Sequence, residues 1–166
     1  MIATRYLDAL RAIVQRLEGE AIDWVVTGSC GFALHGLDVA VHDIDLQTDV
    51  AGAYAIEHAL ADKSCRKVEY SAAERIRSHF GALAIDGVTV EIMGDIQKRL
   101  GDGTWEAPVD IRSHRQWVAI GGMRIPVLAL EYEYTAYLAL GRAEQAEMLR
   151  TWLQEHEHAD NRSRSE

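Results

Sequence analysis

The N-terminal segment of the chain predicts a helix, a short strand, a tight turn and a second helix. Apolar residues recur at helical spacing over 6–17, and Gly19 follows them as a stop signal. The apolar run at 22–26 is typical of a short strand, which meets a turn at 27–29. The compact segment 30–35 then indicates a short helix.

Alternation of apolar and polar positions marks the next element. Within 42–49, Ile44 and Leu46 fall on one face of a predicted strand, and the polar residues between them fall on the other. This pattern is typical of a strand with one buried and one polar face. A helix is predicted to follow over 51–60.

Two hairpins are predicted further along. Asp86-Gly87 separates two alternating apolar runs within 83–90, which indicates a type I′ turn. Gly121-Gly122 divides a second pair of runs within 117–127. Pro126 restricts its own strand to a sheet edge or a strand end, because proline lacks the N–H that a sheet ladder needs.

The C-terminal part is predicted to be helical. The helical pattern begins at Leu130, pauses at Gly141 and resumes through Leu153, so two short helices and one kinked helix fit equally well. Residues 156–166 are polar and lack periodicity, which indicates a disordered tail.

These elements predict one domain of the α/β (α+β) class over residues 1–155. A chain of 166 residues buries roughly two-thirds of its unfolded surface, which is enough for a single core. We expect a mixed, mostly antiparallel sheet, helices largely on one face of it and a helical C-terminal segment.

Composition and charge narrow the classes of function. The chain has 17 Lys and Arg against 26 Asp and Glu, a net charge of -9, which disfavours stable non-specific binding to nucleic acid. The most basic stretch, 63–77, is interpreted as a solvated loop. No apolar run is long enough for a membrane span. The two cysteines, Cys30 and Cys65, fit a reducing compartment, so we expect a cytoplasmic protein.

Three carboxylates form the principal candidate site. Asp43 and Asp45 stand two residues apart on a predicted strand and therefore share a face. Glu91 lies on the polar face of the strand that follows the Asp86-Gly87 turn. If the two strands are neighbours, the three carboxylates repel one another unless a cation lies between them, and Mg²⁺ is the natural partner, with Mn²⁺ as an alternative. The competing interpretation is a solvated acidic patch on an exposed sheet face.

The turn at Gly28-Ser29 is a candidate for binding phosphate. Glycine permits a tight turn out of the strand, and a serine hydroxyl beside the helix N-terminus can donate to an anion. The alternative is that Ser29 only caps the helix. Cys30 is interpreted as a buried side chain rather than a reactive thiolate. Three tyrosines at 132, 134 and 137 are interpreted as packing residues and stay outside the predicted site.

The order of these motifs resembles the DNA polymerase beta-like nucleotidyltransferase superfamily. A strand, Gly28-Ser29, a short helix, Asp43-Ile44-Asp45 and a later acidic residue follow one another as in its minimal bacterial branch, which contains lincosamide-type antibiotic nucleotidyltransferases and abortive-infection toxins. By this resemblance, Gly28 and Ser29 hold nucleotide phosphates. Asp43, Asp45 and Glu91 bind Mg²⁺ and activate the acceptor.

The resemblance implies an enzyme that transfers a nucleoside monophosphate from an NTP, with ATP favoured, to a hydroxyl-bearing acceptor and releases pyrophosphate. The acceptor is a small molecule, a protein or an RNA end. Two alternatives remain open. The same carboxylates suit a metal-dependent phosphohydrolase, and the loss of basic residues that relatives carry, one of them at Tyr137, suits a weakly catalytic domain that binds a protein partner.

Overall fold

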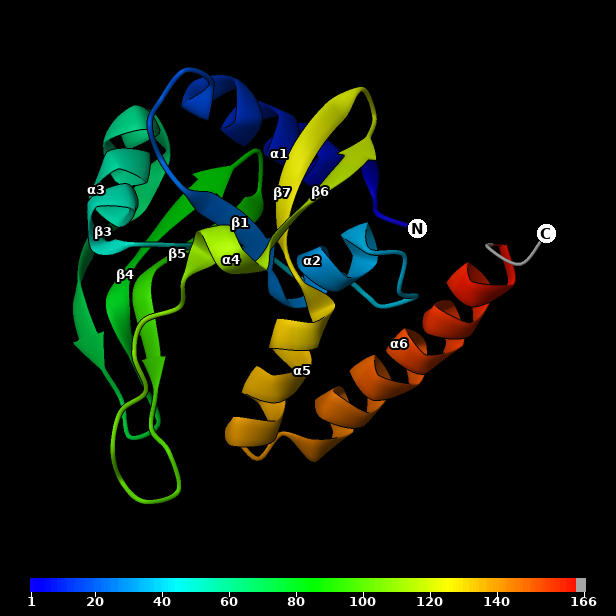
Figure 1. Ribbon diagram of the computed structural model, residues 1–166. Helices are drawn as coiled ribbons and strands as arrows, with labels where there is room; N and C mark the ends of the chain where they lie inside the picture. The colour runs from blue at the N-terminus through cyan, green and yellow to red at the C-terminus, as the bar shows by residue number, and fades with distance from the viewer. Residues whose placement is uncertain (164–166) are drawn as a thin grey trace.

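A seven-stranded mixed sheet organises the chain, shown in the computed structural model of Figure 1. The structure describes residues 1–163, with side chains described to residue 156. The strands are β1 (Trp24–Thr27), β2 (Ile44–Thr48), β3 (Ser64–Ala72), β4 (Ile76–Ile85), β5 (Val88–Lys98), β6 (Arg115–Ile120) and β7 (Met123–Leu128). They lie in the order β3-β4-β5-β2-β1-β7-β6, in which only β2–β5 and β1–β7 are parallel pairs. The predicted mixed, mostly antiparallel sheet is therefore confirmed.

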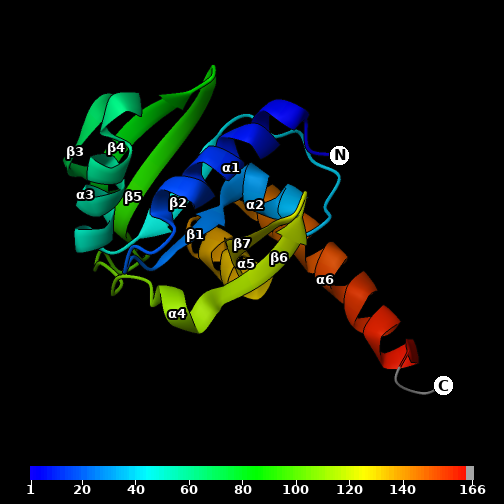
Figure 2. The ribbon, with the colours of Figure 1, turned by 90° about the horizontal axis from the view of Figure 1, so that it is seen from above.

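Helices lie on both faces of this sheet, so the prediction that they lie largely on one face is wrong. They are α1 (Thr4–Leu17), α2 (Gly28–Leu34), α3 (Val50–Ala59), the short 3₁₀ helix η1 (Ala61–Lys63), α4 (Ile111–His114), α5 (Leu130–Ala139) and α6 (Ala143–Ser163). Figure 2 shows α1 and α3 on one side of the sheet and α4 and α5 on the other. The main core forms between the first three helices and the apolar face that includes Ile44, Leu46 and Val90. The opposite faces of β2 and β5 are left for polar side chains.

The two predicted hairpins are confirmed. Asp86 and Gly87 both have positive φ, 48° and 81°, as a type I′ turn requires. Gly121 and Gly122 do the same at 55° and 75° between β6 and β7. β7 is not the edge strand that Pro126 predicted, because it lies between β1 and β6. Pro126 is paired only with β6, through Trp117, and the one pair that joins β7 to β1, Val26 with Val127, begins at the next residue.

The basic stretch at 63–77 is not the loop that we expected, since residues 64–72 form the edge strand β3. β3 pairs with β4 on one side, and eight of its nine side chains are exposed or half-buried. Only Val68 is buried, so the segment lacks the apolar alternation that identifies a strand. Its Arg66 and Lys67 are typical of a sheet edge that avoids further pairing.

A β-bulge at Asp95 reverses the facing of β5. Asp95 has a φ of 48°, and the β4–β5 register shifts between Arg77 and His79, where β5 carries an extra residue. Before the bulge, the even-numbered residue Ile92 belongs to the core. After it, Ile96 and Lys98 face the opposite side, together with Glu91 and Met93. The bulge therefore adds residues to the polar face of the sheet.

The C-terminal part forms two helices rather than one kinked helix. Gly141, with a φ of 71°, separates α5 from α6. The tail predicted from residue 156 differs from the structure, because α6 continues to Ser163. The rest of that predicted tail, 164–166, lies outside the described residues. Among the helices of residues 1–163, none has the length and hydropathy to cross a membrane.

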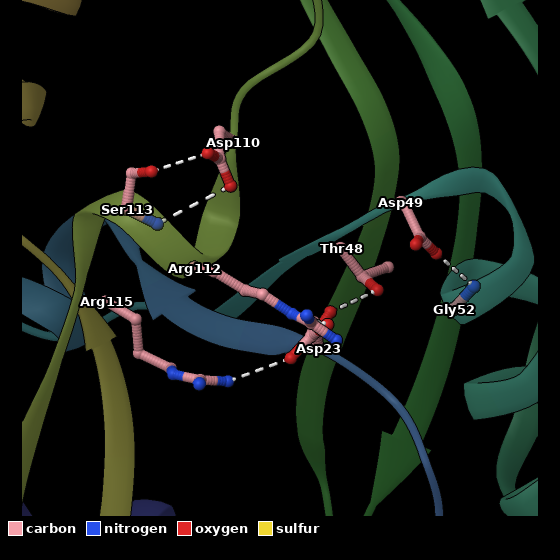
Figure 3. Close-up of polar contacts among 8 residues, drawn as sticks. All are labelled: Asp23, Thr48, Asp49, Gly52, Asp110, Arg112, Ser113 and Arg115. Atoms are coloured by element: carbon pink, nitrogen blue, oxygen red, sulfur yellow. Dashed lines mark hydrogen bonds and ion pairs between the residues drawn. The ribbon is translucent and has the colours of Figure 1, made fainter.

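Ion pairs fix the segment that leads from β5 to β6. Asp23 accepts hydrogen bonds from Arg112 at 2.6 Å and from Arg115 at 3.0 Å, which joins α4 and β6 to the start of β1 (Figure 3). Asp110 caps α4 by accepting from the Ser113 backbone. These contacts hold the connection to β6 on the face of the sheet that carries α5.

Candidate active site

The three predicted carboxylates converge. β2 and β5 are parallel neighbours, and Asp45 lies directly opposite Glu91 in their register. Asp43 lies just before β2, and one carboxylate oxygen from each of the three residues falls within 4.8 Å of the others. The prediction that the Glu91 strand neighbours the Asp45 strand is confirmed. The group is half-buried, which separates it from an ordinary solvated acidic patch.

The ionised form of Asp45 is destabilised by burial and by the neighbouring carboxylates. Burial, followed by the charges of Asp43 and Glu91, raises its pKa from 3.8 to about 7. A bound divalent cation would relieve this repulsion, and carboxylate oxygens are the ligands that Mg²⁺ prefers. The donor set therefore fits a divalent cation such as Mg²⁺, which Asp43, Asp45 and Glu91 would hold.

Position 28 requires a glycine because the Asp45 carboxylate lies so close to it. Its φ is +64°, and a Cβ added there would lie 2.3 Å from Asp45 Oδ2. A side chain at position 28 would collide with the carboxylate. The glycine therefore permits both the turn after β1 and the close approach of Asp45.

Ser29 does not cap the helix. The residue at the N-cap of α2 is Thr27, which makes no side-chain capping hydrogen bond, and Ser29 lies inside the first turn. Its half-buried hydroxyl accepts a long 3.5 Å hydrogen bond from the His42 backbone, beside Asp43. Cys30 is buried as expected, and burial raises the pKa of its thiol to about 12, so it packs as a neutral side chain.

A fourth carboxyl group, Glu133 of α5, lies at the site and was missed by the sequence analysis. It is 4% exposed, and its Oε1 accepts hydrogen bonds from Thr27 Oγ1 and from the Gly28 backbone at 3.3 Å. Burial raises its pKa, although the bonds from Thr27 and Gly28 act in the opposite direction. Its charge also contributes to the raised pKa of Asp45. The end of β1, the glycine turn and α5 are thus joined through one carboxyl group.

A cavity of about 250 Å³ lies between α5 and the strands that carry the carboxylates. Asp45, Glu91 and Glu133 line it, together with Tyr132 and Tyr137 of α5. Both tyrosines were predicted to be packing residues outside the site, because helical spacing alone does not distinguish a core face from a cavity face.

Lys98 is a second residue that the sequence analysis missed. It lines the same cavity although its side chain is almost fully buried, and its Nζ lies 2.6 Å from Glu106 Oε1 and 3.5 Å from the Tyr132 hydroxyl. No sequence signal marks it, because the Asp95 bulge alone turns it toward this face.

The raised pKa of Asp45 predicts how stability depends on pH. Folding favours the protonated form, so in EDTA the free energy of unfolding should lose a few kcal/mol from this group as pH rises from about 4 through 7. Because the substitution Asp45→Asn removes the ionisation, we expect it to stabilise the metal-free protein little near pH 5 and most near pH 8.

The measurement is urea denaturation of both proteins in EDTA across this pH range. Asp38→Asn, at an exposed aspartate outside the triad of Asp43, Asp45 and Glu91, is the control and should show no such trend. A wild-type-to-variant difference that stays constant with pH would contradict the assignment.

Comparison with known proteins adds independent information. A model of the aminoglycoside-2''-adenylyltransferase family matches residues 9–153. A solved structure from Thermotoga maritima, assigned as a nucleotidyltransferase, is 59% identical over 93% of this chain and 96% of its own, with a TM-score of 0.82. A search of the curated proteins found no match.

More distant structures share the fold. The lincosamide antibiotic adenylyltransferase LnuA, bound to lincomycin, is 15% identical with a TM-score of 0.55, over 86% of this chain and 95% of its own. ANT(2'')-Ia, in complex with adenylyl-2''-tobramycin, is 13% identical with a TM-score of 0.57, over 97% of this chain and 99% of its own. At such identities the likeness concerns the fold alone.

Proposed function

The chain belongs to the aminoglycoside-2''-adenylyltransferase family, and on this premise we propose that it transfers a nucleoside monophosphate from ATP to a hydroxyl group, with Mg²⁺ as cofactor. The convergence of Asp43, Asp45 and Glu91 carries the proposal. The fold, shared with adenylyltransferases of antibiotics, supports the reaction class. The two free cysteines, Cys30 and Cys65, agree with a reducing, cytoplasmic setting.

The three carboxylates act together in this proposal. Asp43, Asp45 and Glu91 would hold Mg²⁺, which when bound would neutralise phosphate charge and orient the triphosphate. Glu91, on the neighbouring strand, also takes the proton of the acceptor hydroxyl. The acceptor oxygen forms a bond to the α-phosphorus, the bond from that phosphorus to the bridging oxygen breaks, and pyrophosphate leaves with the electron pair.

Gly28 and Ser29 complete the nucleotide site in this proposal. Gly28 contributes its shape, because the absence of a Cβ leaves room for Asp45. Its N–H is already donated to Glu133, so the phosphate contact falls to the neighbouring Ser29 hydroxyl. The acceptor remains a hydroxyl compound, and an antibiotic aminosugar is the first candidate by analogy with the family.

We expect ATP binding to require a divalent cation. Triphosphate and three carboxylates repel one another strongly, so affinity should fall by at least about 100-fold when Mg²⁺ is replaced by EDTA. Titration calorimetry with ATP in each condition measures the effect, and Mn²⁺ should substitute for Mg²⁺. Equal affinity in EDTA would argue against the metal assignment.

Mass spectrometry of the products tests the reaction itself. The protein is incubated with ATP, Mg²⁺ and a panel of aminoglycosides, lincosamides, tRNA and protein acceptors. An acceptor that gains the mass of AMP, together with released pyrophosphate, supports the proposal. Release of free AMP without a modified acceptor would indicate a hydrolase. Absence of both products across the panel would favour a binding domain.

A further inference from the structure

Glu133 has hydrogen-bonding capacity that the protein does not use. The hydrogen bonds that Thr27 Oγ1 and the Gly28 N–H donate to its side chain both reach Oε1. No side chain or backbone group of the described residues bonds to Oε2. Gln47 Oε1 is the one fully enclosed side-chain atom without a partner in that part of the chain, so Glu133 Oε2 must border open space. Since Glu133 lines the cavity, that space is the cavity itself.

Hydrogen bonds hold this carboxyl group in place. Thr27 Oγ1 donates to Glu133 and accepts from Gln47 Nε2 at 3.4 Å, which forms a buried chain across β1, β2 and α5. Glu133 is 4% exposed and Gln47 is 7% exposed. Because Oε1 is fixed at two points, Oε2 presents a defined position to a ligand in the cavity. This is the geometry of a recognition group rather than of a solvated surface acid.

The ligand group at this position must be compatible with a carboxyl group. An ionised carboxylate accepts hydrogen bonds, and a neutral one both donates and accepts. A hydroxyl group satisfies either state, because it too both donates and accepts. A phosphate oxygen is an acceptor that an ionised carboxylate would repel. A hydroxyl-bearing part of the substrate therefore fits Glu133 in either protonation state.

We propose that Glu133 binds the ribose hydroxyls of the nucleotide and so selects ribonucleotides over deoxynucleotides. The inference rests on the proposed function, which places the α-phosphate at Asp43, Asp45 and Glu91. The ribose is the next group along the nucleotide, and Glu133 is the neighbouring carboxyl group in the same cavity, close enough to influence the pKa of Asp45. Carboxylates recognise ribose hydroxyls in this manner in other nucleotide-binding folds.

The wild-type protein alone provides the first test. Calorimetry with Mg²⁺ and without acceptor compares ATP, 2′-deoxyATP and 3′-deoxyATP. A hydrogen bond to a charged group corresponds to roughly a 10- to 100-fold change in affinity, so at least one deoxy analogue should bind that much more weakly than ATP. Equal affinity for all three would overturn the ribose assignment and leave the proposed function standing.

Two variants of α5 provide the second test. Glu133→Gln keeps an oxygen for Thr27 and Gly28 but replaces the cavity-facing oxygen with an amide nitrogen. It should weaken ATP binding and lower the ATP-to-deoxyATP ratio, because a neutral amide bonds a hydroxyl group more weakly than an ionised carboxylate does. Glu131→Gln changes an exposed acid two residues away and should leave the ratio unchanged.

Three further results would each contradict the ribose assignment, and they can be told apart. If Glu133→Gln keeps the wild-type nucleotide ratio, or changes only the KM for the acceptor, Glu133 does not bind ribose and the inference fails. If the wild type binds no nucleotide in Mg²⁺, both the inference and the proposed function fail. Melting temperatures of the variants report whether each is folded during the measurements.

Discussion

Asp45→Asn is expected to abolish nucleotidyl transfer while the protein stays folded. The substitution keeps the shape of the side chain but removes the charge that would hold Mg²⁺ beside Asp43 and Glu91. We expect a loss of at least about 1,000-fold in kcat/KM, because the metal is the main source of charge stabilisation at the reacting phosphate. A radiolabelled-ATP assay with the best acceptor from the product screen measures this loss.

The effect should be specific to the triad. Asp38→Asn also removes one negative charge, but at an exposed position outside the motif, and should leave the rate within about twofold of the wild type. Asp45→Asn should also abolish the Mg²⁺ dependence of ATP binding. Full transferase activity of Asp45→Asn would exclude the proposed mechanism.

The substitution Gly28→Ala is expected to have the second-largest effect. The added methyl group would lie 2.3 Å from Asp45 Oδ2, so the carboxylate must move away from its position facing Glu91. A residue other than glycine also pays about 1–2 kcal/mol for the left-handed backbone at a φ of +64°. We expect a loss of activity of at least about 100-fold and a lower melting temperature.

A matched glycine separates the two contributions. Gly19 has a φ of +79°, and a Cβ there meets no atom within 4 Å. Gly19→Ala therefore carries backbone strain without a collision, and it should lower the melting temperature while leaving activity unchanged. Equal losses of activity in both variants would mean that general destabilisation, rather than displacement of Asp45, is responsible.

Local patterns were sufficient to predict the framework of the site. Alternation in β2 placed Asp45 opposite the apolar Ile44 and Leu46, and the Asp86 turn fixed which residues of β5 share the face of Glu91. The remaining step, that the two strands are neighbours, is a long-range pairing. The shared polar-face pattern of the two strands was a reason to expect this pairing, and the parallel register of β2 and β5 in the structure confirms it.

The residues that were missed depend on tertiary packing. Glu131 and Glu133 are both acidic residues in the first turn of α5, yet one is exposed and the other is buried against Thr27. The helical pattern cannot distinguish them, because which side meets the sheet is set by the path of β7 into α5. Strand β3 was not predicted because an exposed edge strand needs few apolar residues, so its sequence lacks the apolar alternation that identifies a strand.

The bulge at Asp95 lets β5 change in length without changing the side chains that it presents to the cavity. If β5 kept every residue but alternated regularly, Lys98 would share the core-facing parity of Val90 and Ile92. Deleting Asp95 itself would instead restore regular alternation and leave Lys98 facing the cavity. In an alignment of related chains, a one-residue gap here should therefore preserve the polarity of the downstream positions in the strand. Relatives without the extra residue should keep a polar residue at the position that aligns with Lys98.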